Sequence, residues 1–171
     1  MHFIKLSLQN GILIPKANKI FAKGNFENTA GTVDFAKPVE LTGNTTISAN
    51  DINFSDLNLK TYNIDLTAQN LCFNKSVVSD NNATNSFTLK NLGSAEIKDG
   101  VQISCGQINF TGNGTSSVNA ANFQLNSLDG NISINDERFA SSAKITVNNE
   151  GIFIIDEKSK IQCSNLVKNG N

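Results

Sequence analysis

Few residues of the 171-residue sequence could act together in acid–base or nucleophilic chemistry. A serine or cysteine nucleophile needs a nearby base, and the single histidine, His2, lies at the start of the chain, where terminal segments fray. The cysteines Cys72, Cys105 and Cys163 are far apart and form no CxxC pair, so neither a zinc site nor a closed disulfide framework is indicated. We expect these cysteines to be small thiols that are buried or half-buried.

Carboxylates are the other candidates for catalysis, because clustered aspartates with a basic partner can act on acidic polysaccharides. If the chain repeats about every 20 residues, Asp34 and Asp56 would lie near one face, and so would Asp80 and Asp99. The register of such a repeat drifts, and we interpret the aspartates as solvated corner residues. They are Asp34, Asp51, Asp56, Asp65, Asp80, Asp99, Asp129, Asp136 and Asp156.

The sole arginine, Arg138, stands next to Asp136 and Glu137, and we interpret the three as a local surface charge group. Phosphate-binding glycine loops, zinc-protease motifs and EF-hand loops are absent from the sequence. The sequence therefore names no catalytic, cofactor-binding or metal-ligating residue, and we expect a protein that is not an enzyme. A formal net charge of −1 also argues against a nucleic-acid partner.

Pairs of apolar residues separated by a single residue recur along the chain. A helix would need apolar residues at i, i+3, i+4 and i+7, so this spacing excludes helices and indicates very short strands. The pairs are Ile12/Ile14, Val33/Phe35, Val39/Leu41, Ile52/Phe54, Leu57/Leu59, Ile64/Leu66, Leu71/Phe73, Phe87/Leu89, Ala95/Ile97, Val101/Ile103, Ile108/Phe110, Phe123/Leu125, Ile132/Ile134, Ile145/Val147 and Ile152/Ile154.

Pairs that lie two or three places apart in this series define a longer interval, which is 19 to 22 residues. The intervals run from Val33 to Ile52, Ile52 to Leu71, Phe87 to Ile108, Val101 to Phe123 and Phe123 to Ile145. This is the length of one coil of a three-sided parallel β-solenoid, in which each face contributes one short strand and each corner a polar turn. We therefore predict an all-β fold, a right-handed parallel β-helix with roughly 20 residues per coil.

The predicted coil explains both the apolar pairs and the composition. Each pair points inward, and the corners take Asn, Asp or Gly, which tolerate left-handed backbone angles. The 27 asparagines fit Asn-rich turns or stacked Asn ladders, and they also fit a codon bias that fills tolerant surface positions. Three polar stretches depart from the pattern and are interpreted as plain insertions at corners, although such loops are also where binding sites form. They are Ser76–Phe87, Phe110–Phe123 and Asn135–Lys144.

Three segments follow from this pattern. We expect residues 1–25 to form an N-terminal cap or non-repeating segment, residues 26–156 the solenoid, and residues 157–171 a final partial coil or tail. The final segment shows no obvious cap, and we interpret this as a sign that the chain is a piece of a longer protein. An uncapped coil also allows end-to-end or edge self-association. No apolar run approaches the roughly 18 residues of a membrane span, and no secretory signal is readable.

Two stretches resemble a known class of surface protein. Gly31–Ile47 (GTVDFAKPVELTGNTTI) and Ile108–Ser117 (INFTGNGTSS) resemble passenger-domain repeats of autotransporter and filamentous-haemagglutinin-type proteins. The second stretch is also similar to the F-x-x-N element of chlamydial polymorphic membrane proteins, through Phe110 and Asn113, whereas their companion GGA[ILV] element is missing. The resemblance covers about Val33 to Val147. It implies a right-handed parallel β-helix on the bacterial cell surface, with a role in adhesion or immune contact.

Three functional hypotheses follow. The first is a non-enzymatic solenoid segment of an autotransporter-like surface protein, secreted or at the cell surface, whose partner is a host or cell-surface protein or a glycan. The second is an intracellular, cytoplasmic β-helical scaffold that polymerises end to end, and the three cysteines favour it. The third is a carbohydrate-active β-helix. A different β architecture, such as a β-sandwich or the jelly roll of lipopolysaccharide-transport proteins, is the structural rival.

Overall fold

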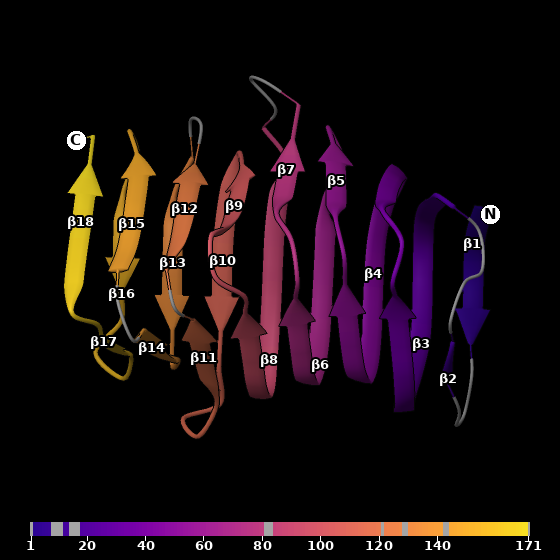
Figure 1. The fold of residues 1–171 in the computed structure, drawn as a ribbon, viewed down its shortest axis with the longest axis horizontal. Coiled ribbons are helices and arrows are strands. Elements are labelled where there is room, and N and C mark those ends of the chain that lie inside the picture. Colours follow the sequence, from indigo (N-terminus) through magenta and orange to yellow (C-terminus); the bar gives the residue numbers. More distant parts are fainter. Residues whose placement is uncertain are drawn as a thin grey trace.

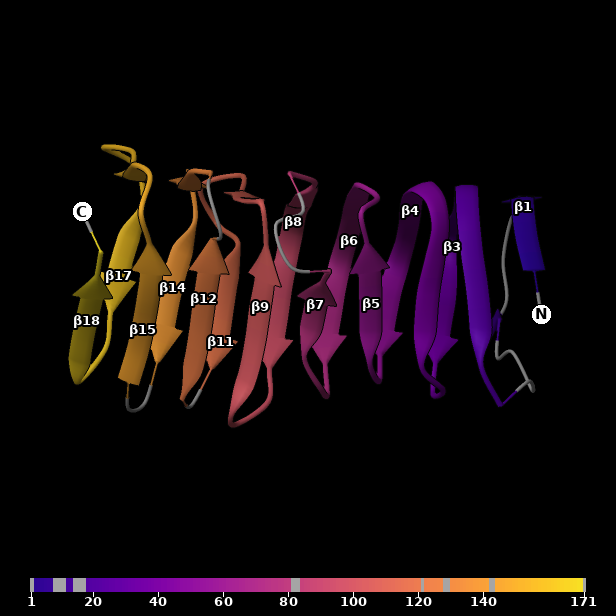
Figure 2. The same ribbon diagram turned by 90° about the horizontal axis from the view of Figure 1, so that it is seen from above.

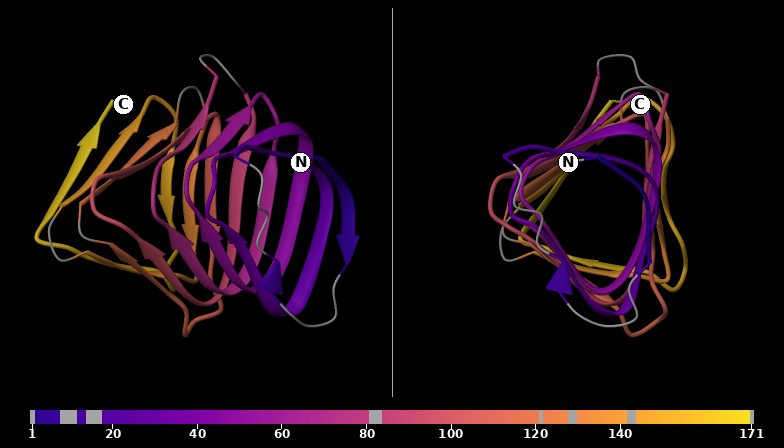
Figure 3. Two further views of the ribbon diagram at one scale, coloured as in Figure 1. Left: turned by 45° about the vertical axis from the view of Figure 1, so that its right-hand side comes forward. Right: turned by 90° about the vertical axis from the view of Figure 1, so that its right-hand side faces the viewer.

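The structure is a computed structural model, and it describes residues 2–7, 12–13, 18–80, 84–120, 122–127, 130–141 and 144–170. Every regular element in these residues is a β-strand, and the strands stack as a solenoid of about seven turns with about 20 residues per turn. The strands lie side by side along one axis from the N-terminal to the C-terminal end (Figures 1 and 2). Seen along that axis, the coils superimpose on a triangular outline (Figure 3).

The eighteen described strands belong to one sheet, and all of their pairings are parallel. Their bounds are β1 His2–Ser7, β2 Ile12–Leu13, β3 Ile20–Phe35, β4 Val39–Phe54, β5 Leu57–Lys60, β6 Ile64–Phe73, β7 Val77–Ser79, β8 Ser86–Ile97, β9 Val101–Cys105, β10 Gln107–Thr111, β11 Ser117–Ala120, β12 Phe123–Ser127, β13 Ile132–Asn135, β14 Arg138–Ser141, β15 Lys144–Asn149, β16 Phe153–Ile155, β17 Lys160–Gln162 and β18 Asn165–Asn169.

The pairing divides the sheet into three faces. Face 1 contains residues 20–22 of β3 and 39–41 of β4, followed by β5, β7, β9, β12, β15 and β18. Face 2 contains residues 24–28, 45–49, 64–68 and 86–90, followed by β10, β13 and β16. Face 3 contains residues 32–35, 51–54, 70–73 and 94–97, followed by β11, β14 and β17.

The predicted fold class is confirmed, and the register matches the predicted intervals pair by pair. Val33 pairs with Ile52, and Ile52 pairs with Leu71. The same holds for Phe87 with Ile108, and for Phe123 with both Val101 and Ile145. The strands are parallel, which distinguishes this fold from the antiparallel sandwich and jelly-roll alternatives.

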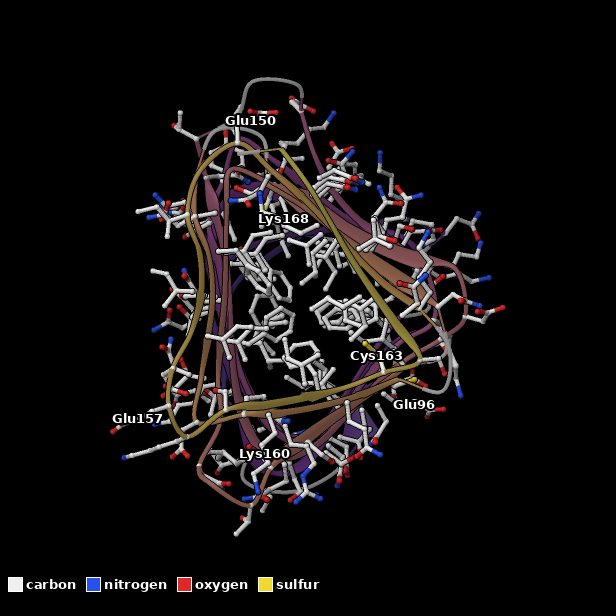
Figure 4. All side chains as sticks on the ribbon, turned by 90° about the vertical axis from the view of Figure 1, so that its left-hand side faces the viewer. Glu96, Glu150, Glu157, Lys160, Cys163 and Lys168 are labelled. Carbon is white, nitrogen blue, oxygen red and sulfur yellow. The ribbon has the colours of Figure 1, made fainter. Side chains whose placement is uncertain are left out.

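The core is one continuous apolar column inside the coils (Figure 4). Phenylalanine rings from successive coils stack in it: the ring centroids of Phe35 and Phe54 are 5.0 Å apart, and those of Phe54 and Phe73 are 5.6 Å apart. Tilted or edge-on contacts continue this stack through Phe87 and Phe110. Aromatic pairs of this kind stabilise a core beyond their buried area, so they tie each coil to the next.

The predicted apolar pairs point inward in most coils, but the last pair was assigned to the wrong positions. Phe153 pairs with the inward Ile132, so Ile152 and Ile154 face away from the core and are 63 % and 41 % exposed. Phe153 itself packs against the core. The run Ile152–Ile155 is apolar at every position, so alternation alone could not set its phase.

Parallel pairing extends into the N-terminal segment that the sequence assigned to a cap or non-repeating segment, and into the C-terminal segment that it assigned to a final partial coil or tail. β1 and β2 pair with β3, and residues 20–22 of β3 pair with β4, so the stacking begins within residues 1–25 rather than after them. At the other end, β17 and β18 pair with β14 and β15, which makes residues 160–169 part of a final coil. Pro15 and Lys16, which the sequence assigned to the cap, lie outside the described residues.

Asparagines stabilise the corners, as their abundance suggested. The backbone N–H of Asn63 donates to the Asn44 side-chain oxygen at 3.0 Å, and the N–H of Ser86 donates to the Asn63 side-chain oxygen at 2.9 Å. Each of these amides pairs a backbone donor of the next coil at a point where the strand ladder is interrupted.

Candidate functional site

Four successive coils of face 1, those of β3, β4, β5 and β7, carry charged side chains that alternate in sign on or next to their strands. The Nζ atom of Lys19 lies 2.7 Å from the Glu40 carboxylate, that of Lys60 lies 4.0 Å from the same carboxylate, and Lys60 Nζ lies 3.8 Å from the Asp80 carboxylate. We call Lys19, Glu40, Lys60 and Asp80 the charge ladder. The hydrogen bond from Lys19 lowers the pKa of Glu40, so this carboxylate is charged at neutral pH.

In the last four described coils of face 1, one outward column consists of a hydroxyl followed by three amides. Nδ2 of Asn126 donates to the Ser104 hydroxyl oxygen, Nδ2 of Asn148 to Oδ1 of Asn126, and Nδ2 of Asn169 to Oδ1 of Asn148, each at 2.7 Å. We call Ser104, Asn126, Asn148 and Asn169 the amide ladder. Its three bonds all point toward the N-terminal end, so each side chain fixes the orientation of the next.

A second outward column runs beside the amide ladder. Gln102 pairs with Gln124, which pairs with Thr146 on the next coil. Nε2 of Gln124 donates to Oδ1 of Asn126 at 2.7 Å, which ties the two columns together. Among the described outward residues of β9, β12, β15 and β18, Lys144 is the one that carries a charge.

An open hollow of about 180 Å³ borders these columns where face 3 turns into face 1. Gly100 forms part of its floor and has a φ of +75°, a left-handed backbone angle that favours glycine at this turn. The lining residues are Gly100, Val101, Gln102, Asn122, Phe123, Gln124, Lys144 and Thr146. They come from three successive coils, so the hollow is elongated along the solenoid axis.

The aspartates that the sequence singled out are not brought together in the described part of the chain. Asp34 lies on face 3 opposite Asn53, whereas Asp56 lies in the turn before β5, 3.5 Å from the Lys75 ammonium. Asp80 follows β7 at the corner between faces 1 and 2, and Asp99 precedes β9 at the corner between faces 3 and 1. The alternative that places Asp34 near Asp56 and Asp80 near Asp99 is therefore not supported. The interpretation as corner residues holds for Asp56, Asp80 and Asp99, whereas Asp34 lies within β3. Asp129 lies outside the described residues.

The remaining described aspartates hold local structure. Asp51 accepts hydrogen bonds from the Asn70 amide at 2.7 Å and the Thr32 hydroxyl at 3.1 Å, and the Asn70 bond is the main cause of its lowered pKa. Asp65 points outward from face 2. The backbone N–H of Asp136 donates to the Asp156 carboxylate, so these two residues join neighbouring coils at one corner.

Glu137 corrects the interpretation of its neighbourhood as a surface charge group. Arg138 is exposed, but the Glu137 side chain is buried, with 2 % of the residue exposed. One carboxylate oxygen accepts from Asn91 Nδ2 at 2.9 Å, and the other accepts from the Arg138 backbone N–H at 3.0 Å. Burial raises the pKa of Glu137, while the hydrogen bonds from Asn91 and Ser116 act in the opposite direction.

Asn91 and Glu137 are 46 residues apart, so their contact skips one coil. The skipped coil contributes Ser116, which is also buried, beside a loop that projects from the corner between β10 and β11 (Figure 3). Because the loop projects outward, it leaves space between the coils on either side, and the Asn91 and Glu137 side chains form their hydrogen bond in that space. No pattern in the sequence indicates this burial, because adjacent charged residues normally indicate a solvated surface.

The cysteines are free, as predicted. Cys105 is buried, and Cys72 and Cys163 are partly buried. Burial raises the pKa of the Cys105 thiol to about 12, and this thiol donates to the Gln107 carbonyl. Cys105 therefore packs in the core as a neutral thiol.

Two searches of the described residues bear on other classes of site. No group of three or more His, Cys, Asp or Glu side chains is placed to hold a metal ion in the described part of the chain. The same residues contain no helix with the length and apolar character needed to cross a membrane.

The amide ladder was not predicted as a site, although the sequence carries its signal. Its members directly follow the second inward residue of each face 1 strand, as in Ile103-Ser104 and Leu125-Asn126. They recur at intervals of 22, 22 and 21 residues. A search for polar residues at the coil period would have found them.

Comparisons with known proteins add no relative. No protein-family model matches the chain, and neither the curated proteins nor the solved structures include a detectably similar one. The predicted likeness to autotransporter and haemagglutinin repeats therefore extends, on present findings, to the parallel β-solenoid fold alone.

Proposed function

We propose that the chain is a non-enzymatic β-solenoid segment of a bacterial surface protein of the autotransporter type, with an adhesive or structural role. The observation that supports this proposal best is the amide ladder, which presents outward amides at a regular spacing of about 4.8 Å per coil. Such a surface offers many oriented donors and acceptors to a partner but no activated nucleophile. An extended, rigid scaffold with oriented polar groups suits recognition rather than turnover.

Surface display can be tested with antibodies raised against the folded chain. Intact cells and permeabilised cells of the organism that carries the gene are labelled in parallel and examined by electron microscopy. Labelling of intact cells supports the proposal, and an antibody against a cytoplasmic protein serves as the control for cell integrity. Labelling that appears only after permeabilisation would exclude surface display.

A second candidate, an intracellular scaffold that polymerises end to end, is favoured by the apolar side chains of the last described coil. Ile152, Ile154, Ile155 and Leu166 are 63 %, 41 %, 42 % and 44 % exposed. Exposed apolar residues next to an unpaired strand edge favour addition of another strand. Sedimentation of the purified chain into filaments, reduced by Leu166→Lys, would favour this candidate. A monomer at all concentrations would argue against it.

A further inference from the structure

The hollow beside the amide ladder has the composition of a ligand site rather than of a packing defect. Its rim carries the carboxamides of Gln102, Gln124 and Asn122 and the hydroxyl of Thr146. These groups point out of the solenoid, because the intervening residues, such as Phe123, point into the core. A ligand placed along the hollow would meet a hydrogen-bonding group on each of three consecutive coils.

Two of the three carboxamides are held in place before any ligand arrives. Gln124 is tied to Asn126 of the amide ladder at 2.7 Å, and Asn122 donates from Nδ2 to the Asp99 carboxylate at 2.9 Å. Side chains that are already ordered lose little conformational entropy on binding. The surface is therefore preorganised for a ligand that also repeats along the solenoid axis.

Lys144 is the one charged residue among those that line the hollow, and the Asp99 carboxylate lies at the same corner. Lys144 follows Asn122 in the column that continues to Asn165, and its exposed ammonium group borders the hollow. At the same corner, the Asp99 carboxylate accepts hydrogen bonds from the backbone N–H and the side chain of Asn122. These bonds hold the carboxylate against the neighbouring coil. A ligand with an anionic group has its charge complement in Lys144.

We propose that the hollow and the amide ladder bind a strand of acidic polysaccharide that lies along the solenoid axis. The amides and Thr146 bind the sugar hydroxyls, and Lys144 binds a uronic acid carboxylate. The coil rise of about 4.8 Å is comparable with the length of one sugar residue in an extended chain, so successive residues meet successive coils. This inference rests on the proposed adhesive function and names the chemical class of its ligand.

The test is titration calorimetry of the whole chain with a uronic acid oligosaccharide and with its methyl ester. The ester keeps every ring hydroxyl and removes the charge. We expect the acid to bind and the ester to bind at least about tenfold more weakly. Lys144→Gln should reduce the affinity for the acid to the affinity for the ester. Gln124→Ala should reduce the affinity for both ligands.

The matched control is Lys160→Gln, which removes an exposed lysine from β17 on face 3 and should leave binding unchanged. Circular dichroism and thermal melting of each variant check that the fold is intact. Binding of neither oligosaccharide, equal binding of both, or equal losses in the Lys144 and Lys160 variants would overturn the inference. Surface labelling of intact cells is a separate measurement. It therefore shows whether the proposed ligand alone is wrong or whether the proposal of surface display is also wrong.

Discussion

Face 1 has two halves that differ in how they connect neighbouring coils on the outside. In the N-terminal half, the charge ladder of Lys19, Glu40, Lys60 and Asp80 uses opposite charges. In the C-terminal half, the amide ladder uses hydrogen bonds of 2.7 Å between neutral side chains. The backbone pairing is parallel in both halves, and both enclose the same apolar core.

The difference shows that a β-solenoid leaves its outward positions open to more than one solution. Ion pairs at exposed sites contribute about 0 to 1 kcal/mol and are screened by salt. A hydrogen bond between amides contributes about 0.5 to 1.5 kcal/mol and does not titrate. The amide half therefore combines ordered side chains with a single outward charge, Lys144, whereas the charges of the N-terminal half pair with one another.

The largest expected effect comes from substitutions in the apolar core that the two halves share. Leu59 lies under the charged half and Leu125 under the amide half, and they are 0 % and 1 % exposed. Replacing either by alanine should destabilise the protein by about 2 to 5 kcal/mol, because each substitution leaves a cavity in one continuous core. Urea unfolding followed by circular dichroism measures both. A large loss in one variant with almost none in the other would show that the halves unfold independently.

The second effect belongs to the amide half alone. Asn148 donates to Asn126 and accepts from Asn169, so Asn148→Ala should cost about 1 to 2 kcal/mol. Asn148→Asp should cost more, because its carboxylate cannot donate to Oδ1 of Asn126 and places two acceptors face to face. The control is Gln162→Ala, on the exposed side of β17, which should change the urea midpoint very little. Equal midpoints for all three variants would mean that the ladder bonds do not contribute to stability.

The comparison also shows what the sequence could predict. The inward pairs set the fold, because a period of two within strands and of about 20 residues between coils depends only on which residues are apolar. The interval from Val33 to Ile52 predicted their pairing directly. Where that pattern lost its alternation, as at Ile152–Ile155, the predicted faces were wrong.

Outward and corner contacts were less predictable, because they depend on register shifts that single coils introduce. The segment between β7 and β8 and the loop before Ser116 lengthen their coils, so aspartates about 20 residues apart do not align. Burial of Glu137 depends on the same loop, which opens a space that Asn91 reaches from two coils away. No local pattern encodes such a contact.

The third effect is the pH dependence of the stability that Glu137 contributes. Glu137 belongs to neither ladder, so its pH dependence can be compared with that of both. Burial raises the pKa of Glu137 above its ordinary value of 4.5, so the folded state holds this proton more tightly than the unfolded state. The stabilisation is complete below pH 4.5 and is lost as the pH rises through the raised pKa. Glu137→Gln should therefore become more stable relative to the wild type as the pH rises above 4.5, measured as the difference in melting temperature. A difference that stays constant, or that falls with pH, would contradict the assigned burial.

The smallest effect distinguishes the ladders themselves. Glu40 has a pKa that its bond from Lys19 lowers below 4.5, so its contribution is present above pH 4.5 and is lost as the pH falls through the lowered pKa. Glu40→Gln should cost at most about 1 kcal/mol at neutral pH, because Lys19 is half exposed. That cost should shrink in acid and in 1 M salt, where the screening length falls to about 3 Å.

Asn148→Ala supplies the matched measurement in the neutral half, because amides neither titrate nor attract counterions. Its cost should be the same at low and high salt and at pH 4 and pH 7. If salt weakened both variants equally, the alternating charges would not be the source of the difference between the halves. Two outward columns on one face would then be interchangeable, and the neutrality of the amide ladder would have to be explained by what it binds rather than by how it holds the coils together.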